Sequence, residues 1–399
     1  MSDFLNLKTP RGFRAAGMSC GIKSSGAHDI ALFVSDGEAT VVGMFTTNRV
    51  QAAPVRSSRE RLSRNGGLGR AIVVTSGNAN AATGAQGREV VEAICQEVSG
   101  AIGCDNDQVL IAQTGIIGIP LDQMVATSGA GAVTRRLAQP SWEDAARGMM
   151  TTDTHPKCAW RQVSIDGVVH TVAGFAKGVA MAAPAMATMI VVVLTDAKLG
   201  SAAAREALKS SVRDSFHQLN IDGCQSTNDS VFLMANGEAG GAEIGDGLSV
   251  KLFHEAVQGV CDDLVKQMAG DAEGGTKLIM VDVRGAVTRD DARMIARQVV
   301  GSNLVKCAIA GECPYWGRVI AEVGAAGVEI DPDNIAISFG PHLLCEKSLA
   351  VPFDHEGVTA YLKGREVVIT VELNGGNESA RAFGSDLTPE YVKINMEKS

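Results

Sequence analysis

Thr188 has the sequence context of a nucleophile that could activate itself. It follows a stretch of small residues punctuated by Pro184, and it precedes the β-branched run 190–193, which is typical of a buried strand. The sequence therefore predicts that Thr188 opens a strand. Its hydroxyl could attack the carbonyl carbon of Ala187 and form an ester, which water would hydrolyse, so that Thr188 becomes the first residue of a new chain.

The α-amino group released by this cleavage would serve as a base for the same hydroxyl. An α-amino group titrates near neutral pH and can accept the proton of the nucleophile. A plain hydrophobic core also contains strands of this kind, and most threonines in such a context are structural. The local sequence thus allows two interpretations, and other segments must decide between them.

Short motifs spread over nearly the whole chain favour the catalytic interpretation. In chain order they are residues 11–17 (RGFRAAG), 45–48 (FTTN), 76–84 (SGNANAATG), 113–118 (QTGIIG), 151–154 (TTDT), 226–229 (STND), 273–277 (EGGTK), 314–318 (PYWGR) and 386–395 (DLTPEYVKIN). Together they resemble the ornithine acetyltransferases, a self-cleaving N-terminal-nucleophile family that moves acetyl from N-acetylornithine to glutamate. Each motif alone has little specificity, whereas their order along the chain is very specific.

The resemblance implies an oxyanion hole at Thr114 and Gly115. Acyl transfer passes through a tetrahedral intermediate whose negative oxygen must be held by preset donors. In the family these donors are the hydroxyl that matches Thr114 and the backbone amide that matches Gly115. The pair follows the apolar strand predicted at 109–112, and glycine allows a close backbone approach to a ligand.

The resemblance also implies a set of substrate-binding residues. An amino-acid substrate with an α-carboxylate and a side-chain ammonium requires a fixed cation and a carboxylate, which Lys177 and Glu273 could supply. A shift of one residue would exchange Thr151 for its neighbour Thr152. The tail is one residue shorter than the common pattern, so its last residue takes a shifted position. The full set is Thr151, Lys177, Thr188, Glu273, Asn395 and Ser399.

Three departures from the family pattern weaken the prediction of substrate identity. Cys224 stands where an aspartate is usual, which removes a negative charge near the predicted site. Ala185 and Ala180 replace an asparagine and a glycine close to the cleavage site. We therefore expect discrimination between ornithine and neutral side chains to be softer than in the family.

Composition agrees with a small-molecule enzyme. The net charge of −9 and the aromatic content of 4% argue against a nucleic-acid or anionic-membrane partner. The cysteines and histidines have no metal-ligand spacing, and the glycine-rich loops match no nucleotide-binding fingerprint. We expect no metal and no cofactor, with acetyl-CoA as a further substrate that the sequence does not decide. The start has no apolar signal core and the longest uncharged run is short for a membrane span, which predicts a soluble cytoplasmic protein.

Alternating helix and strand patterns predict a mixed α and β protein. Strands are expected at 71–75, 109–112, 190–193, 277–283, 335–339 and 367–373, a hairpin at 163–172, and helices at 88–102, 202–219, 253–268 and 291–300. The resemblance implies an α/β (α+β) fold like that of DmpA and the ornithine acetyltransferases, which is a layered sheet sandwich flanked by helices with a smaller C-terminal α/β lobe.

The resemblance further implies a division of the chain by cleavage. Residues 1–187 would form the α chain and the N-terminal part of the catalytic sandwich. Residues 188–285 would start the β chain and complete the catalytic core, and residues 286–399 would form the C-terminal lobe with the substrate-contacting tail. Two α and two β chains would assemble into a heterotetramer.

The function that fits these observations best is acetyl transfer from N2-acetylornithine to glutamate in arginine biosynthesis. The transfer would proceed by a ping-pong mechanism through an acetyl-Thr188 ester. Three alternatives remain open at this point: a related self-cleaving aminopeptidase or amidase, in which water resolves the ester; an acetyltransferase for a different amino acid; and a cleaved but inactive amino-acid-binding protein.

Overall fold

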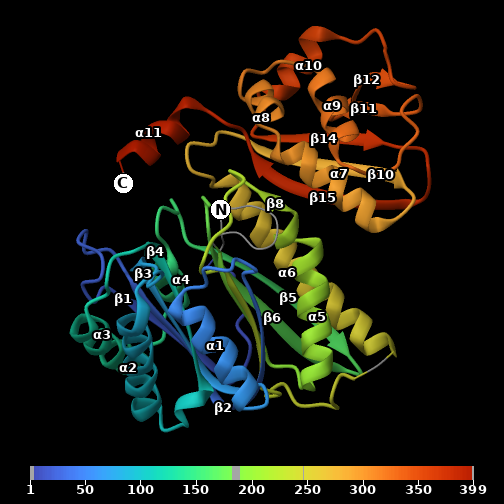
Figure 1. The fold of residues 1–399 in the computed structure, drawn as a ribbon. Helices are drawn as coiled ribbons and strands as arrows, with labels where there is room; N and C mark the ends of the chain where they lie inside the picture. Colours follow the sequence, from blue (N-terminus) through green and yellow to red (C-terminus); the bar gives the residue numbers. More distant parts are fainter. Residues whose placement is uncertain (1–3, 182–188, 246, 398–399) are drawn as a thin grey trace. The chain divides into compact units, whose positions relative to one another are not determined.

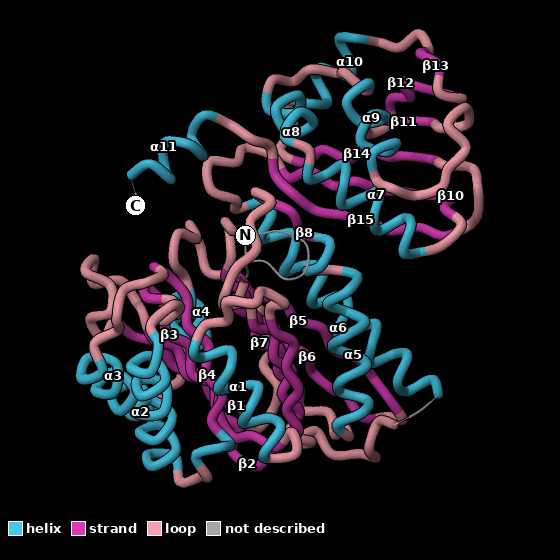
Figure 2. Tube along the Cα trace, viewed as in Figure 1, coloured by secondary structure: helices cyan, strands magenta, loops and turns pink. Residues whose placement is uncertain are grey.

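The computed structural model describes residues 4–181, 189–245 and 247–397, which form two compact units (Figure 1). Within these residues, the first unit comprises 4–178, 189–212 and 225–264, and the second comprises 179–181, 213–224 and 265–397. Each unit is built around its own β-sheet (Figure 2). The chain therefore passes between the units several times, and neither unit is continuous in sequence.

An eight-stranded sheet forms the centre of the first unit. Its order is β4-β3-β2-β9-β7-β6-β5, with β1 beside β2. The bounds are β1 Phe13–Met18, β2 Ile30–Phe45, β3 Leu68–Asn78, β4 Val109–Ile116, β5 Lys157–Ile165, β6 Val168–Lys177, β7 Ile190–Thr195 and β9 Ser230–Ala235. Strand β2 shifts register between Val34 and Ala39. Its first part pairs with β1 and β3, and its second part pairs with β9, so β2 belongs to two halves of the sheet.

The two halves share a hydrophobic core. Alternate residues of β2 and β4, such as Phe33 and Leu110, pack in one cluster with alternate residues of β6, β7 and β9, such as Phe175, Val192 and Phe232. The opposite face of β2–β4 packs on α2 (Gly84–Ile102) and α3 (Gln123–Arg136). On the other half, Gly174 of β6 meets α6 (Gly247–Gly270), because a Cβ there would lie 2.6 Å from Val260. The predicted sheet sandwich flanked by helices is confirmed.

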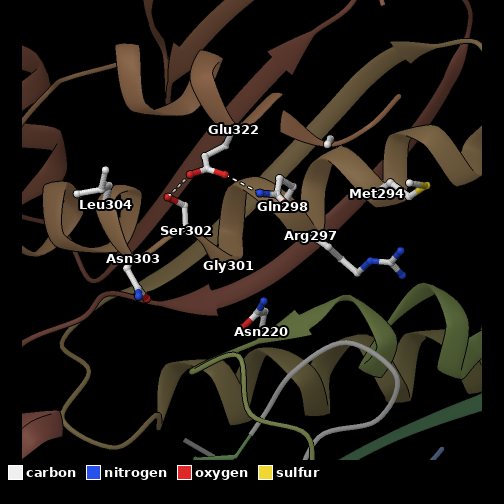
Figure 3. A pocket seen from close by; sticks show the side chains of 10 residues that line it. Asn220, Met294, Arg297, Gln298, Gly301, Ser302, Asn303, Leu304 and Glu322 are labelled. Atoms are coloured by element: carbon white, nitrogen blue, oxygen red, sulfur yellow. Dashed lines mark hydrogen bonds between the residues drawn. The ribbon is translucent and has the colours of Figure 1, made fainter. Parts of the chain in front are cut away.

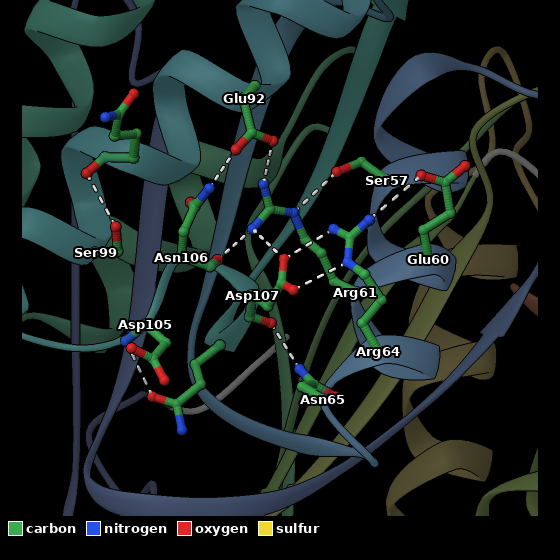
Figure 4. A network of polar contacts seen from close by, with 12 residues as sticks. Ser57, Glu60, Arg61, Arg64, Asn65, Glu92, Ser99, Asp105, Asn106 and Asp107 are labelled. Atoms are coloured by element: carbon green, nitrogen blue, oxygen red, sulfur yellow. Dashed lines mark hydrogen bonds and ion pairs between the residues drawn. The ribbon is translucent and has the colours of Figure 1, made fainter.

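The remaining helices of this unit are α1 (Ala53–Arg64), α4 (Trp142–Met149) and most of α5 (Ser201–Asp214). A polar network fixes α1 against its neighbours (Figure 4). The fully buried Arg61 donates to the Glu92 carboxylate at 2.5 Å, to Ser57 Oγ at 3.0 Å and to the carbonyl of Asn106. Because each part of this buried charge has a partner, we assign the network a structural role.

A seven-stranded sheet forms the centre of the second unit, in the order β13-β12-β11-β14-β10-β15-β8. The bounds are β8 Leu219–Asn220, β10 Leu278–Ala286, β11 Ala336–Phe339, β12 His342–Glu346, β13 Leu349–Ala350, β14 Glu366–Glu372 and β15 Glu378–Ser385. The helices are α7 Arg289–Gly301, α8 Asn303–Ala310, α9 Gly317–Ala325, α10 His355–Leu362 and α11 Pro389–Glu397. Side chains such as Ile279, Ile295 and Ile369 form its core. This unit is the predicted smaller α/β lobe, although it also recruits residues 213–224.

Most predicted elements occur with boundaries that differ by a few residues. The hairpin at 163–172 turns at Asp166 and Gly167, whose positive φ angles of 50° and 81° suit a type I′ turn. One prediction is wrong at its end: the helix expected to reach Leu219 stops at Asp214. The chain then forms a 3₁₀ turn at Phe216–Gln218 and the short strand β8, because Leu219 pairs with Phe383 of β15. No helix among the described residues is long and apolar enough to cross a membrane. The division at residues 187 and 285 remains a prediction.

Candidate active site

Several strands of the first unit end or begin side by side. The last residue of β6, Lys177, lies opposite Ile190, the first residue of β7. Ile190 in turn lies opposite Ser230, the first residue of β9. Thr114 lies near the end of β4, opposite Ser76 of β3. This edge of the sandwich gathers the motifs at 76–84, 113–118 and 226–229.

Lys177 connects two of the predicted site residues. Its side chain is buried, and its ammonium donates to Thr151 Oγ1 at 2.7 Å and to Thr114 Oγ1 at 3.3 Å. A hydroxyl that accepts a hydrogen bond from a cation becomes a stronger donor through its own hydrogen. The geometry therefore equips Thr114 to donate to a negatively charged oxygen.

Asp153 neutralises part of the charge of this cluster. Its fully buried carboxylate accepts from Lys157 Nζ at 2.8 Å and from the backbone amide of Gly178 at 2.9 Å, and it lies 3.9 Å from Lys177 Nζ. Burial alone would raise the pKa of Asp153, but the ammonium groups of Lys177 and Lys157 outweigh it and hold the pKa well below its ordinary value. The carboxylate is therefore ionised throughout the physiological range.

Lys23 is a third lysine at this edge of the first unit. Besides Lys157 and Lys177, Lys23 donates to the carbonyls of His28 and Met150, and burial and the nearby Lys177 both lower its pKa, although Asp29 opposes them. The charges of Asp29 and Asp153 act in the opposite direction and raise the pKa of Lys23. Ammonium groups at this edge favour a bound carboxylate or a developing oxyanion.

The conformation of Gly115 requires glycine for a reason that the sequence did not show. Its φ angle is 132°, and a Cβ atom would lie 2.3 Å from the carbonyl carbon of Gly77 on the neighbouring strand. The close approach of β3 thus imposes glycine at this position. Its backbone amide lies directly after Thr114, where a second oxyanion donor is expected.

Asn228 and Asp229 of the STND motif connect the strands at this edge. The motif alone indicates no role for them. Asn228 Nδ2 donates to the carbonyl of Gln113 at 2.8 Å, and Asp229 Oδ1 accepts from the backbone amide of Met189 at 3.1 Å. Both side chains are buried. Burial raises the pKa of Asp229 well above its ordinary value, against the opposing effects of the Met189 amide and the charge of Lys177. A carboxyl group directly before a strand that is apolar apart from its first residue, Ser230, is the signal in the sequence that identifies it.

A second group of predicted residues lies in the second unit. Asn395 of α11 donates to the Glu273 carboxylate at 3.0 Å. Close to them, the Tyr391 hydroxyl donates to Asp222 at 3.3 Å, and burial, followed by the charges of Asp222 and Glu273, raises the pKa of Tyr391. Asp222 therefore provides a carboxylate in this group even though Cys224 carries none. Thr114, Thr151 and Lys177 form one group and Glu273 and Asn395 another, each within its own unit.

The predicted nucleophile lies outside the described residues. The same holds for the other partner of the predicted cleavage site and for the end of the tail. These residues are Ala187, Thr188 and Ser399. What the structure describes is the residue that follows the nucleophile, Met189, whose amide is bonded covalently to the Thr188 carbonyl.

The second unit also contains a polar pocket of about 540 Å³ (Figure 3). It is lined by Asn220 and by residues of α7, α8 and α9. In its wall, Glu322 accepts from Ser302 Oγ at 2.8 Å and from Gln298 Nε2 at 2.6 Å. None of the described residues predicted to be catalytic or to bind substrate lines it. We therefore do not assign it to the acyl-transfer site.

Burial of His217, together with the charge of Arg297 in this pocket, makes the second unit sensitive to acid. Burial and then the positive charge of Arg297 lower the pKa of His217 from 6.5 to about 4. Between these values the unfolded chain binds the proton and the folded chain does not, so stability is lost as the pH falls through this window, by up to about 3 kcal/mol. His217→Gln should lose less stability than the wild type between pH 6.5 and 4, as measured by urea unfolding. Equal losses would contradict this assignment.

Removing the Asp153 carboxylate should destabilise the first unit. Asp153→Asn removes the carboxylate that pairs with the buried ammonium groups of Lys157 and Lys177, and breaking a buried ion pair in this way costs about 3–5 kcal/mol. The matched control is Asp36→Asn, because Asp36 pairs with Arg14 at 2.8 Å on the exposed surface, where a pair contributes about 0–1 kcal/mol. Urea unfolding at neutral pH measures both. Similar losses in the two variants would show that the buried cluster is not held by Asp153.

Among the described residues, no group of histidine, cysteine or acidic side chains has the arrangement of a metal site. The sheet sandwich flanked by helices and the buried ammonium–hydroxyl cluster at its strand edge are instead those of an enzyme. The ArgJ family model matches residues 14–398. The chain is 42% identical over 389 residues to the arginine biosynthesis bifunctional protein ArgJ of Symbiobacterium thermophilum, covering 97% of this chain and 96% of that protein.

Two further comparisons agree. The ArgJ protein of Caldanaerobacter subterraneus is 40% identical over 394 residues, which cover 98% of this chain and 97% of the relative. The crystal structure of ArgJ from Bacillus halodurans has 41% sequence identity and a TM-score of 0.50, covering 51% of this chain and 96% of that one. The chain belongs to the ArgJ family.

Proposed function

We propose that this enzyme transfers acetyl from N2-acetylornithine to glutamate after cleaving itself between Ala187 and Thr188. The observation that supports this most directly is the Lys177–Thr114 contact of 3.3 Å at the edge where β7 begins. The Thr114 hydroxyl, polarised by Lys177, lies at the same edge of the sheet as the start of β7. The proposed nucleophile, Thr188, precedes β7 in the sequence. The names of the relatives place them in arginine biosynthesis, which is the pathway that this reaction would serve.

The proposed chemistry has two stages. In the first, Thr188 Oγ attacks the carbonyl carbon of Ala187, the peptide C–N bond breaks, and water hydrolyses the resulting ester to an Ala187 carboxylate and a free Thr188 amine. In the second, the amine accepts the proton of the hydroxyl, which attacks the acetyl carbon of N-acetylornithine. Ornithine leaves with its amino group protonated, and the glutamate amine then attacks the acetyl-Thr188 ester to form N-acetylglutamate and regenerate the hydroxyl.

The described residues support these steps with separate roles. The Thr114 hydroxyl and the Gly115 amide are proposed as donors to the tetrahedral oxygen, and Lys177 polarises the first of them. Thr151 contributes the other hydroxyl that binds Lys177. Glu273 and Asn395, which are hydrogen-bonded to each other, are proposed to recognise the amino-acid portion of the substrate, together with Ser399.

The resemblance supports three further proposals, on assembly, cofactor use and location. The enzyme would consist of two α and two β chains, use no cofactor, and act in the cytoplasm. Acetyl-CoA is a further candidate acetyl donor, which would let the enzyme form N-acetylglutamate without recycling. Its use would be tested by following free thiol release from acetyl-CoA in the presence of glutamate.

One assay separates the proposed function from its alternatives. The purified chain is mixed with N-acetylornithine and glutamate, and both N-acetylglutamate and free acetate are quantified. Formation of N-acetylglutamate in step with ornithine supports the transferase. Acetate with ornithine but no N-acetylglutamate would indicate an amidase. If no ornithine is released, the protein would be an inactive amino-acid-binding protein.

We expect a measurable but incomplete preference for N-acetylornithine. Cys224 supplies no charge, whereas Asp222 and Glu273 keep carboxylates in the second unit. Neutral N-acetyl amino acids of similar length should therefore compete. The kcat/KM ratio of N-acetylornithine to N-acetylnorvaline measures this, and a preference above about ten-thousandfold would show a fully paired polar site and contradict the expectation.

A further inference from the structure

The proposed catalytic groups lie on different halves of the sandwich. Thr114 and Gly115 lie near the end of β4, which belongs to the half with β1 and β3, whereas the proposed nucleophile precedes β7, which belongs to the half with β9 and β6. Between the halves lies a core of apolar side chains. Apolar packing is not directional, so it does not by itself fix the two catalytic groups to within a fraction of an ångström.

Asn228 makes a directional contact with the oxyanion half. Its Nδ2 donates to the carbonyl of Gln113 at 2.8 Å, the residue directly before Thr114, and to the carbonyl of Ala79 at 2.6 Å, just beyond β3. The side chain is 3% exposed. Its Oδ1 lies 2.5 Å from the hydroxyl of Thr227, which fixes the orientation of the amide. One amide group thus binds the ends of both strands.

Asp229, the next residue, makes a directional contact with the nucleophile half. Its Oδ1 accepts from the Met189 amide at 3.1 Å, and this amide nitrogen belongs to the peptide bond that joins Thr188 to Met189. The following amide, that of Ser230, donates to the Met189 carbonyl at 3.1 Å. Asp229 is completely buried. Met189 is therefore held on both sides of its backbone.

We propose that Asn228 and Asp229 are positioning residues that set the separation between the oxyanion donors and the nucleophile. Two consecutive residues bind the two halves through side chains that point to opposite partners, so the distance between their contacts is limited by a single peptide unit. The proposal rests on the proposed function for its catalytic consequence. The contacts themselves are independent of the reaction.

The test compares Asp229→Ala with Asp229→Asn. Alanine removes the acceptor for Met189, whereas asparagine keeps an oxygen in the same place. We expect kcat to fall by about a hundredfold in Asp229→Ala, with KM little changed, because a displacement of about 1 Å at a reacting group has an effect of this size. Asp229→Asn should recover most of this loss. Asn228→Ala should lower kcat in the same way.

Ser58→Ala is the matched control for buried polar contacts on β4. Ser58 is fully buried, donates to the carbonyl of Ile111 at 2.7 Å and accepts from its amide at 2.8 Å, and neither of these hydrogen bonds involves β7. It should lose stability without a specific loss of kcat. If Ser58→Ala lowers kcat as much as Asn228→Ala, the effect is general loosening and the proposal is overturned.

Hydrogen exchange at the Met189 amide provides a readout that does not depend on turnover. In protein labelled with ¹⁵N-methionine, NMR should show faster exchange at Met189 in Asp229→Ala than in the wild type or in Asp229→Asn. Unchanged exchange, or faster exchange with normal kcat, would overturn the proposal. Should the wild type transfer no acetyl, the proposed function fails, while the exchange rates still decide whether Asp229 holds Met189.

Discussion

Thr188→Ala is expected to remain a single chain and to transfer no acetyl. The substitution removes the hydroxyl that attacks Ala187 and later carries the acetyl group, and loss of a nucleophile costs about a millionfold in kcat. The wild type should separate on a denaturing gel into pieces of about 19 and 22 kDa, in proportion to their residue counts in the 41.5 kDa chain. The variant should run at the full mass.

Thr188→Ser is the matched control for this result. Serine retains both a hydroxyl and, after cleavage, an α-amino group, so cleavage and part of the activity should survive. If Thr188→Ala were cut at the same bond, or if it kept substantial transferase activity, another nucleophile would have to act. N-terminal sequencing of the N-terminal and C-terminal pieces shows whether the chain is cut at this bond or elsewhere.

Thr114→Val is expected to lower kcat by about a hundred- to a thousandfold. Valine keeps the shape of threonine but removes the hydroxyl that accepts from Lys177 at 3.3 Å and is proposed to donate to the oxyanion. Loss of one such donor has an effect of this size in the transition state, whereas KM should change little. Steady-state kinetics with both substrates, and the rate of self-cleavage, measure the effect.

Thr40→Val controls for the loss of a hydroxyl in the same unit. Its Oγ1 donates to the carbonyl of Leu199 at 2.9 Å, a contact that involves none of the proposed catalytic residues. We expect normal kcat in this variant. A Thr114→Val enzyme that turned over as fast as Thr40→Val would remove the Thr114 hydroxyl from the mechanism.

The sequence predicted the strands of the site better than their ends. Val109–Ala112 is apolar and was expected as a strand, but β4 continues to Ile116. Residues 113–115 are polar or glycine, so the apolar run ends before them, yet Thr114 still pairs with Ser76. Pairing with a neighbouring strand depends on tertiary structure, which a local pattern does not contain.

Two carboxylates that support the site, those of Asp153 and Asp229, belong to the motifs at 151–154 and 226–229, but the sequence does not indicate what they contact. Asp153 is separated by 24 residues from Lys177, and only the fold brings its carboxylate to within 3.9 Å of that ammonium. The same is true of Asp229 and Met189, which are 40 residues apart. The resemblance identified Thr114, Thr151 and Lys177, whereas the contacts among them come from strand order and register.

The interleaving of the two units was also hidden from the sequence. Residues 213–224 join the second unit because β8 adds to the edge of its sheet beside β15. No linker or change of composition marks this passage, and the apolar pattern of α5 continues through Phe216 and Leu219. Both residues are buried, but outside the helix.

The acetyl-enzyme itself provides the most direct test of the mechanism. The purified protein is incubated with N-acetylornithine in the absence of glutamate, quenched in acid, digested and analysed by mass spectrometry. The proposed mechanism predicts one added acetyl group on the hydroxyl of Thr188, in a peptide that begins with this residue, and its disappearance when glutamate is added. An unmodified Thr188 peptide during active turnover, or an acetyl group on another residue that glutamate removes, would contradict it.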